Sequence, residues 1–262
     1  MDIRAEVWSP LQNTAVWLGA WLYGHAATDD LLEALVSLGG EQALADDTPF
    51  IDFLSTVRQA AQDAQAADAN SAGDSEPVLR LILSGPGEAP GLRAGSESAK
   101  EAARNKSGAL VVRTGDPDCH LILLPTEQPG RIIWKVVEET RPLPAPTWLS
   151  PGEADALLTE ATNESATMIE AAATEIDAPS LPNPRLTVGS LSDFYDTPGL
   201  PDAVPPRAAK LFARADNVAA IIEAVADRAG DHSFDPQLLR LWRHIRTARM
   251  TGVAYCVREF SR

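Results

Sequence analysis

The fold is decided by residues 109–137, which read ALVVRTGDPDCHLILLPTEQPGRIIWKVV. Three apolar runs, at 109–113, 120–124 and 132–137, are separated by short segments rich in Gly, Pro and Asp. Valine and isoleucine favour strands, and the residues between the runs favour tight turns. Connections this short force neighbouring strands to run antiparallel. The stretch therefore predicts a three-stranded antiparallel meander.

A further strand is predicted ahead of the meander, at 78–83 (VLRLIL). Its place in the sheet stays open, because a glycine- and proline-rich loop and a short helix separate it from the next strand. The apolar runs of all four strands are nearly continuous and do not alternate with polar residues. Such runs indicate that both faces of the sheet are covered, at least in part, by the flanking helices.

Helix-start signals lie on both sides of this sheet. Ser9-Pro10 and Ser150-Pro151 each place a capping serine before a proline at the first helical position, and Thr48-Pro49 does the same with threonine. Apolar residues then recur at three- and four-residue steps. Together these signals predict helices at about 10–24, 29–38, 49–66, 98–104, 151–176, 206–229 and 236–258.

The predicted fold class is therefore α+β: a small, mostly antiparallel sheet at about 77–139, packed by N-terminal and C-terminal helices. We expect a single α+β domain over 1–262. The segment 179–206 holds seven prolines, and a loop of that length is usually a linker or a functional lid. A break there would separate 1–178 from a C-terminal helical part at 207–262.

Charge and composition exclude several classes of protein. The chain has 22 Lys and Arg against 37 Asp and Glu, a net charge of −15, which repels phosphate backbones and makes nucleic acid an unlikely partner. The apolar run at 14–23 is about half the ~20 residues that cross a bilayer, and no basic segment precedes it, so no membrane association is expected. Cys119 and Cys256 are expected to be reduced thiols in the cytoplasm.

No motif names a reaction, a metal or a cofactor. The loop 85–91 follows a strand, but two prolines remove N–H donors and no Gly-Lys-Ser/Thr follows, so a phosphate loop is not predicted. No two histidines stand at metal-ligand spacing, and Cys119 and His120 point to opposite faces of their strand. An enzyme assembled from dispersed residues stays an alternative. Its sign would be a pocket that joins His120 or His244 to carboxylates or arginines.

The last helix is basic although the chain is acidic. Residues 235–262 hold six arginines against two acidic residues, a charge of +4, so the other 234 residues hold −19. Two interpretations compete for its candidate binding residues. The arginines pair with acidic helices such as 151–176, or they bind a phosphorylated or other anionic partner. The candidates are Arg240, Arg243, Arg246 and Arg249.

Our leading hypothesis is a cytosolic protein-binding or adaptor protein without catalytic activity. The first helix carries Trp17 and Trp21 and has little polar surface, and Phe194 and Tyr195 lie in the proline-rich segment. A helix that is apolar nearly all round is either central in the core or covered by a partner. These four aromatic residues are therefore the candidates for contact with a protein partner or for self-association.

Overall fold

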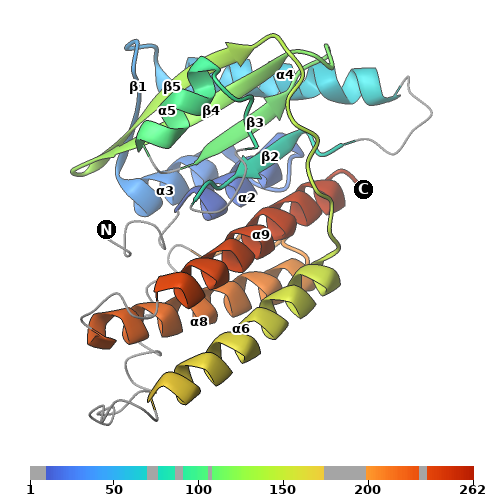
Figure 1. The fold of residues 1–262 in the computed structure, drawn as a ribbon. Helices are drawn as coiled ribbons and strands as arrows, with labels where there is room; N and C mark the ends of the chain where they lie inside the picture. The colour runs from blue at the N-terminus through green and yellow to red at the C-terminus, as the bar shows by residue number, and fades with distance from the viewer. Residues whose placement is uncertain (1–9, 70–75, 86–90, 106–107, 174–198, 230–234) are drawn as a thin grey trace.

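The computed structural model describes residues 10–69, 76–85, 91–105, 108–173, 199–229 and 235–262 (Figure 1). In chain order the elements are α2 (Pro10–Leu22), α3 (Thr28–Gly39), β1 (Glu41–Leu44), α4 (Phe50–Ala69), β2 (Leu79–Ile82), α5 (Glu97–Asn105), β3 (Ala109–Arg113), β4 (His120–Gln128), β5 (Arg131–Glu139), α6 (Pro151–Ala173), α8 (Pro206–Ala229) and α9 (Asp235–Phe260). The predicted α+β class is confirmed. None of the described helices combines the length and the hydropathy that crossing a membrane requires.

The sheet has the strand order β1-β5-β4-β3-β2. The predicted meander is β3-β4-β5, and the predicted strand at 78–83 is β2, which pairs antiparallel with β3. Strand β1 was not predicted. It pairs parallel with β5, so the sheet is mixed. The pairing needs a close approach of two turns, because a Cβ at Gly40 would lie 2.1 Å from the carbonyl oxygen of Gly130.

The hydrogen bonds at the helix starts differ between α6 and α3. At α6 the Ser150 N–H donates to Glu153 Oε2 at 2.7 Å, and the Glu153 N–H donates to Ser150 Oγ at 3.2 Å. The predicted capping serine is therefore part of a capping box. At α3 the Asp30 carboxylate accepts the Ala27 N–H, while Thr28 Oγ1 accepts a hydrogen bond from another helix. Ser9 lies outside the described residues.

Both faces of the sheet are covered. One face packs against α2, α4 and α9 and holds the larger core, in which Trp134 of β5 stacks on Phe53 of α4 at a ring-centroid distance of 6.2 Å. The other face packs under α5, Leu92 and Leu143. The near-continuous apolar runs therefore follow from burial on two sides.

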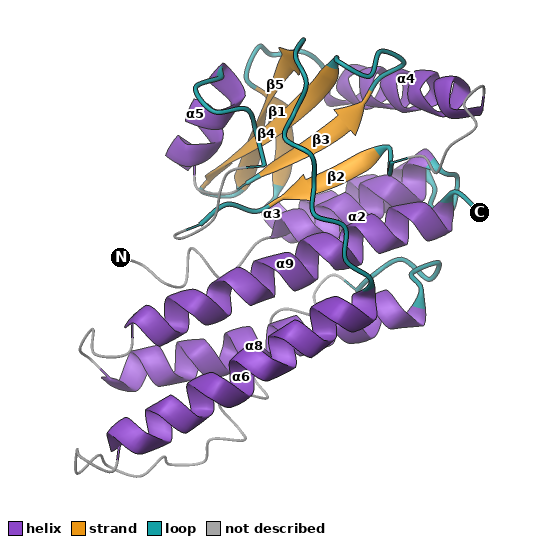
Figure 2. Cartoon of the chain, turned by 45° about the vertical axis from the view of Figure 1, so that its right-hand side comes forward, coloured by secondary structure: helices purple, strands orange, loops and turns teal. Residues whose placement is uncertain are grey.

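Helices α6, α8 and α9 form a second layer with its own core (Figures 1 and 2). Helix α9 belongs to both cores, with Trp242 in the helical layer and Val257 against the sheet. It also covers the edge strand β2, where the Leu83 N–H donates to Met250 Sδ at 3.3 Å. Residues 140–150, here called the strap, join β5 to α6 without forming a helix or a strand, and cross the front of the sheet.

Candidate anion-binding recess

The arginines singled out on α9 are largely engaged inside the molecule. Arg249 Nη2 lies 2.6 Å from Asp216 Oδ1 of α8, and both side chains are buried. Arg240 Nη1 lies 2.9 Å from Glu164 Oε2 of α6. Arg246 is buried, with its guanidinium packed on Gly85, and Arg243 is exposed. This geometry fits the internal-pairing interpretation for Arg240 and Arg249.

The aromatic candidates do not form one surface within the described residues. Trp21 is buried, donates from Nε1 to Thr28 Oγ1 at 3.0 Å and lies under the Arg58 guanidinium. Trp17 is half-buried and donates from Nε1 to the Gly199 carbonyl oxygen at 3.0 Å. Phe194 and Tyr195 lie outside the described residues. Trp21 therefore contributes to the core and not to a surface.

A different arginine stands out in the structure. Arg80 lies in the middle of β2 and is half-buried, and this burial lowers the pKa of its guanidinium, an effect that Glu76 partly opposes. Among the described residues, no carboxylate lies within salt-bridge distance of Arg80. Because a desolvated guanidinium without an anionic partner is unfavourable, Arg80 is a candidate for binding an anion.

Two further basic side chains share the face of the sheet on which Arg80 lies. Arg113 of β3 is paired directly with His120 of β4, and Arg80 is paired with Val111, two residues before Arg113. Residues opposite each other, or two apart along a strand, share one face. Arg113 is already occupied, since its two Nη atoms donate to the Asp68 carboxylate at 2.9 and 2.8 Å.

The environment of His120 keeps its imidazole neutral at pH 7. Burial lowers the pKa of His120, and the charges of Arg80 and Arg113 lower it further, against smaller opposite effects of Glu76 and Asp118. Its Nδ1 is buried without a hydrogen-bond partner. A proton on Nδ1 would bury an unpaired donor, so the tautomer protonated on Nε2 is favoured. His120 therefore adds an N–H donor without adding charge.

The strap and α9 bring an aromatic ring and an arginine together. The Arg258 guanidinium carbon lies 4.6 Å from the centroid of the Trp148 ring. Helix α9 and β2 run in opposite directions (Figures 1 and 2) and meet at Met250 and Leu83. Leu79 and Leu81 lie in the core that α9 covers, so Arg80, which stands between them and is paired with Val111, lies on the opposite face of β2.

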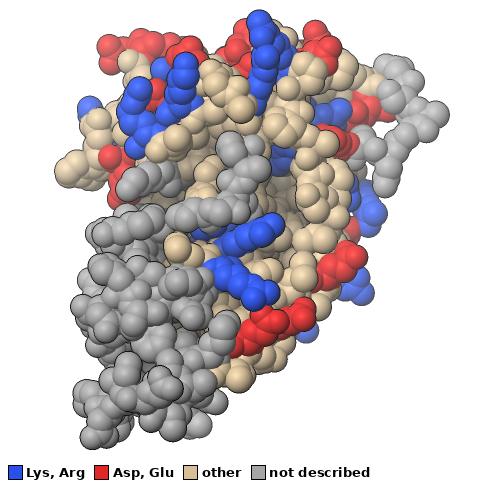
Figure 3. Space-filling view, in the orientation of Figure 1, with Lys and Arg blue, Asp and Glu red and all other residues tan. Residues whose placement is uncertain are grey.

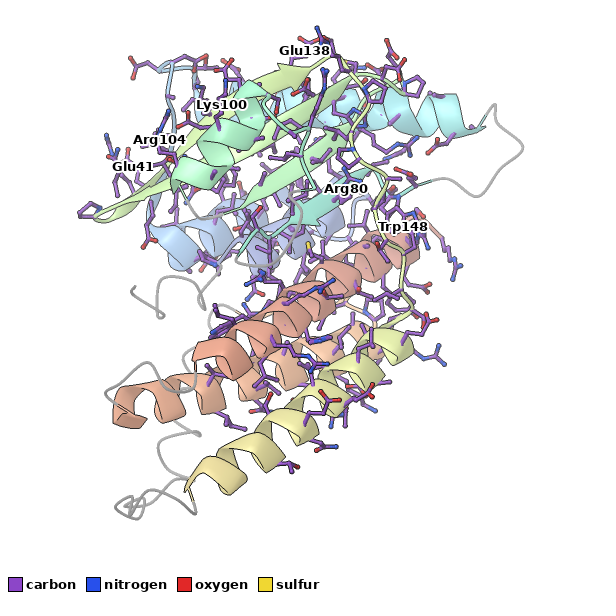
Figure 4. All side chains as sticks on the ribbon, in the orientation of Figure 1. Glu41, Arg80, Lys100, Arg104, Glu138 and Trp148 are labelled. Atoms are coloured by element: carbon purple, nitrogen blue, oxygen red, sulfur yellow. The ribbon has the colours of Figure 1, made fainter. Side chains whose placement is uncertain are left out.

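The surface is hollowed at this corner. Figure 3 shows a recess of mostly uncharged atoms between the sheet and the helical layer, with Lys and Arg side chains at its border. Figure 4, in the same orientation, labels Arg80 on β2 and Trp148 on the strap. We call the surface around Arg80 and His120 the Arg80 recess and define it by these two residues. It offers one guanidinium group and a neutral N–H donor.

The described residues give little support for metal binding or for catalysis by a thiol. No group of three or more His, Cys, Asp or Glu side chains there is arranged to hold a metal ion. Cys119 donates from Sγ to Glu138 Oε1 at 3.2 Å, and burial together with this carboxylate raises the pKa of the thiol. A raised pKa leaves little thiolate at neutral pH, so Cys119 is a poor nucleophile.

Sequence reasoning missed Arg80 as a candidate binding residue. One signal was present, because Arg80 is the single charged residue in the apolar run 78–83. A charged residue in the middle of a buried strand needs a partner or an opening to solvent.

Comparison with known proteins places the chain in a family. The model for the N-terminal domain of Rv1486c-like proteins matches residues 12–148, and the model for their C-terminal domain matches 152–250. The two models meet at the end of the strap, whereas the break expected at 179–206 lies mostly outside the described residues. No solved structure matches the chain.

Full-length relatives come from mycobacteria. The uncharacterized protein ML1804 of Mycobacterium leprae (strain TN) is 25% identical over 94% of this chain and 97% of its own length. The uncharacterized protein Rv1486c of Mycobacterium tuberculosis (strain ATCC 25618 / H37Rv) is 24% identical over 84% of each chain. With both domain models matched in order along its length, the chain belongs to the family of Rv1486c-like proteins.

Proposed function

We propose that this chain is a binding protein that takes an anionic group, a phosphate or a carboxylate, in the Arg80 recess. The observation that carries the proposal is the half-buried Arg80 guanidinium, which has no carboxylate within salt-bridge distance among the described residues. An anion that enters the recess restores the interactions that burial removed from this group. Charge-assisted hydrogen bonds to arginine are among the strongest in proteins.

The surroundings of Arg80 favour a small, localised anion over a polyanion. The chain as a whole has a net charge of −15, and Glu76 and Asp118 are exposed close to His120. These carboxylates repel an extended chain of phosphates but leave room for one anionic group that reaches Arg80 directly. This supports a specific ligand or a single acidic side chain, and not a nucleic acid.

The carrier of the anion is either a small molecule or an acidic segment of a partner protein. In the second case the chain acts as an adaptor in the cytoplasm, a location that its free thiols Cys119 and Cys256 support. Val36 and Ile51 are exposed apolar side chains that a protein partner would cover. Single exposed apolar residues are normal on soluble proteins, so these two carry less weight than Arg80.

An enzyme is the second candidate, and one observation favours it. His120 lies near both Arg80 and Arg113, which is the kind of cluster that an active site assembled from dispersed residues would need. A neutral imidazole beside two arginines can accept a proton from a bound acid. Conversion of a phosphate or carboxylate ligand by the wild-type chain, lost in His120→Gln with binding retained, would establish this role.

The binding proposal is tested with defined anions at constant ionic strength. We expect inorganic phosphate or citrate to raise the melting temperature of the wild-type chain, since a ligand that binds only the folded state stabilises it. Arg80→Gln should abolish this rise. Arg104→Gln is the matched control, because Arg104 is exposed on α5 and pairs only with its helical neighbour Glu101 among the described residues. An equal response of wild type and Arg80→Gln would overturn the proposal.

The carrier is tested by affinity capture with three baits: wild type, Arg80→Gln and Arg104→Gln. A protein captured by wild type and by Arg104→Gln, but not by Arg80→Gln, would show that a partner protein presents the anion. If defined small anions bind through Arg80 and no protein depends on it, the ligand is a small molecule. Capture that is equal for all three baits would place any protein contact outside the recess.

A further inference from the structure

The strap, residues 140–150, has the sequence features of a polyproline II helix. It reads TRPLPAPTWLS, with prolines at 142, 144 and 146. Each proline fixes its own φ at about −65°, and the residue before a proline is directed to extended or polyproline II geometry. All residues from Arg141 to Pro146 are therefore restricted to the backbone region of the polyproline II helix.

The hydrogen bonding of the strap agrees with this conformation. Pairing of β5 with β4 ends at Glu139, and the next backbone N–H that donates to a described residue is that of Ser150, which donates to Glu153. Within the described part of the chain, no backbone group of residues 141–149 takes part in a hydrogen bond. A polyproline II helix has no internal hydrogen bonds and keeps its backbone solvated.

The exposure of the strap repeats every three residues. Leu143, Pro146 and Leu149 are half-buried, and the residues between them are exposed. Leu143 packs on the core of the sheet face that α5 covers, and Leu149 packs on the core of the helical layer. Because a polyproline II helix has three residues per turn, one edge of the strap faces the chain and two edges face solvent.

The two free edges differ in chemistry. One edge is apolar and holds Pro142, Ala145 and Trp148, of which Trp148 is 37% exposed. The other edge begins at the exposed Arg141, which forms no ion pair with the described residues. A partner that covers both edges would bury an exposed indole and provide a carboxylate for this guanidinium.

We infer that the strap is a docking segment for a partner protein whose groove is lined by aromatic side chains and has a carboxylate at one end. Grooves of this kind bind proline-rich segments that already have the polyproline II conformation. Pro142 and Trp148 enter the groove, and Arg141 pairs with the carboxylate. The inference concerns the strap and does not rest on the Arg80 recess.

The chain holds the strap in the shape that such a groove requires. The prolines restrict the backbone, and Leu143 and Leu149 attach its inner edge to two cores. The Arg258 guanidinium carbon lies 4.6 Å from the centroid of the Trp148 ring and so restricts the indole as well. Little conformational freedom is left to lose on binding, which lowers the entropic cost of docking.

The experiment uses the full chain as bait in an extract of the cells that contain it, with a synthetic peptide of residues 140–150 as competitor. The prolines restrict the free peptide as they restrict the strap, so the two compete for one groove. We expect the peptide to displace a protein from the bait. A peptide with alanine in place of the three prolines should need a concentration about tenfold higher, because its backbone is not restricted before binding.

Variants of the full chain locate the contact. The displaced protein is purified, and its binding is measured by isothermal titration calorimetry. Trp148→Ala should weaken binding about tenfold, as expected for a tryptophan at the centre of an interface, and Arg141→Gln should weaken it less. Leu157→Ala is the matched control, because Leu157 of α6 is 38% exposed and lies outside the strap. Circular dichroism melting checks that each variant is folded.

Three outcomes would overturn the inference. The first is that the peptide of residues 140–150 displaces no protein from the bait. The second is that the peptide without prolines displaces the protein equally well. The third is that Trp148→Ala and Leu157→Ala bind the protein equally, and if Arg80→Gln alone weakens that binding, the partner uses the Arg80 recess and the proposed function is retained.

Discussion

Asp216 of α8 and Arg249 of α9 form an ion pair in the interior, with Oδ1 and Nη2 2.6 Å apart and side chains only 13% and 4% exposed. The pair joins two long helices of the helical layer beside a core of small and branched residues. Removing one partner would take from the other, in a buried place, the opposite charge nearest to it. Its contribution to stability therefore depends on both partners being present.

The first prediction concerns this pair. Arg249→Met should lower the free energy of unfolding by about 3–5 kcal/mol, because the buried Asp216 carboxylate loses the guanidinium that lies 2.6 Å from it. Urea denaturation of the full chain measures the change. Arg240→Met is the control, since the Arg240–Glu164 pair is 56% and 42% exposed and such pairs contribute less than about 1 kcal/mol. Similar losses for both variants would contradict the prediction.

The second prediction concerns the contact of α8 with α9 at Gly252. A Cβ at Gly252 would lie 2.3 Å from Cε1 of Phe212, whose side chain is buried. Gly252→Ala should therefore destabilise the chain by about 1–3 kcal/mol through overpacking. Gly152→Ala is the matched helical control, because a Cβ there meets only Ser150 Oγ at 4.0 Å. Thermal melting should show the control unchanged or stabilised by up to about 1 kcal/mol.

The third prediction is an alkaline loss of stability linked to Tyr23. Burial, with a smaller contribution from Asp68, raises the pKa of Tyr23 to about 12, against an opposite effect of Arg113. The folded pKa lies above the unfolded value of 10.0, so this contribution is full below pH 10 and is lost as the pH rises toward 12. Urea titrations from pH 9 to 11.5 should show a steeper fall for wild type than for Tyr23→Phe. Parallel profiles would count against it.

The fourth prediction is that His120 contributes to a loss of folding stability at acid pH. The pKa of His120 in the folded chain lies below its ordinary value of 6.5, so the unfolded chain binds a proton that the folded chain resists. Stability should therefore fall as the pH drops below about 6.5, through the window down to the lowered folded pKa. His120→Gln should flatten this part of the profile. An unchanged slope in the variant between pH 7 and 5.5 would show that other groups cause the acid loss.

The sequence by itself determined the elements whose stability is local. The meander β3-β4-β5 follows from apolar runs joined by tight turns, and α6 begins where Ser150 and Glu153 exchange hydrogen bonds. Each of these depends on residues close together in the chain, so residue type and spacing are sufficient to predict them. The same holds for burial of both sheet faces, which continuous apolar strands already require.

Only the tertiary structure decided the features that depend on distant contacts. Strand β1 has no apolar alternation of its own, and it forms because Gly40 can approach Gly130 and because Trp134 Nε1 donates to Gln42 Oε1 at 2.7 Å. The internal pairing of Arg249 needed Asp216 from another helix.

The Arg80 recess is the clearest case of a feature that the sequence could not assign. Arg80 is one charged residue in an apolar strand, and whether it is paired, buried or open to a ligand depends on what covers that strand. The structure leaves Arg80 half-buried near His120, with no carboxylate at salt-bridge distance among the described residues. Desolvation and electrostatic pairing act through space, and the separation of these residues along the chain gives no measure of their distance in the fold.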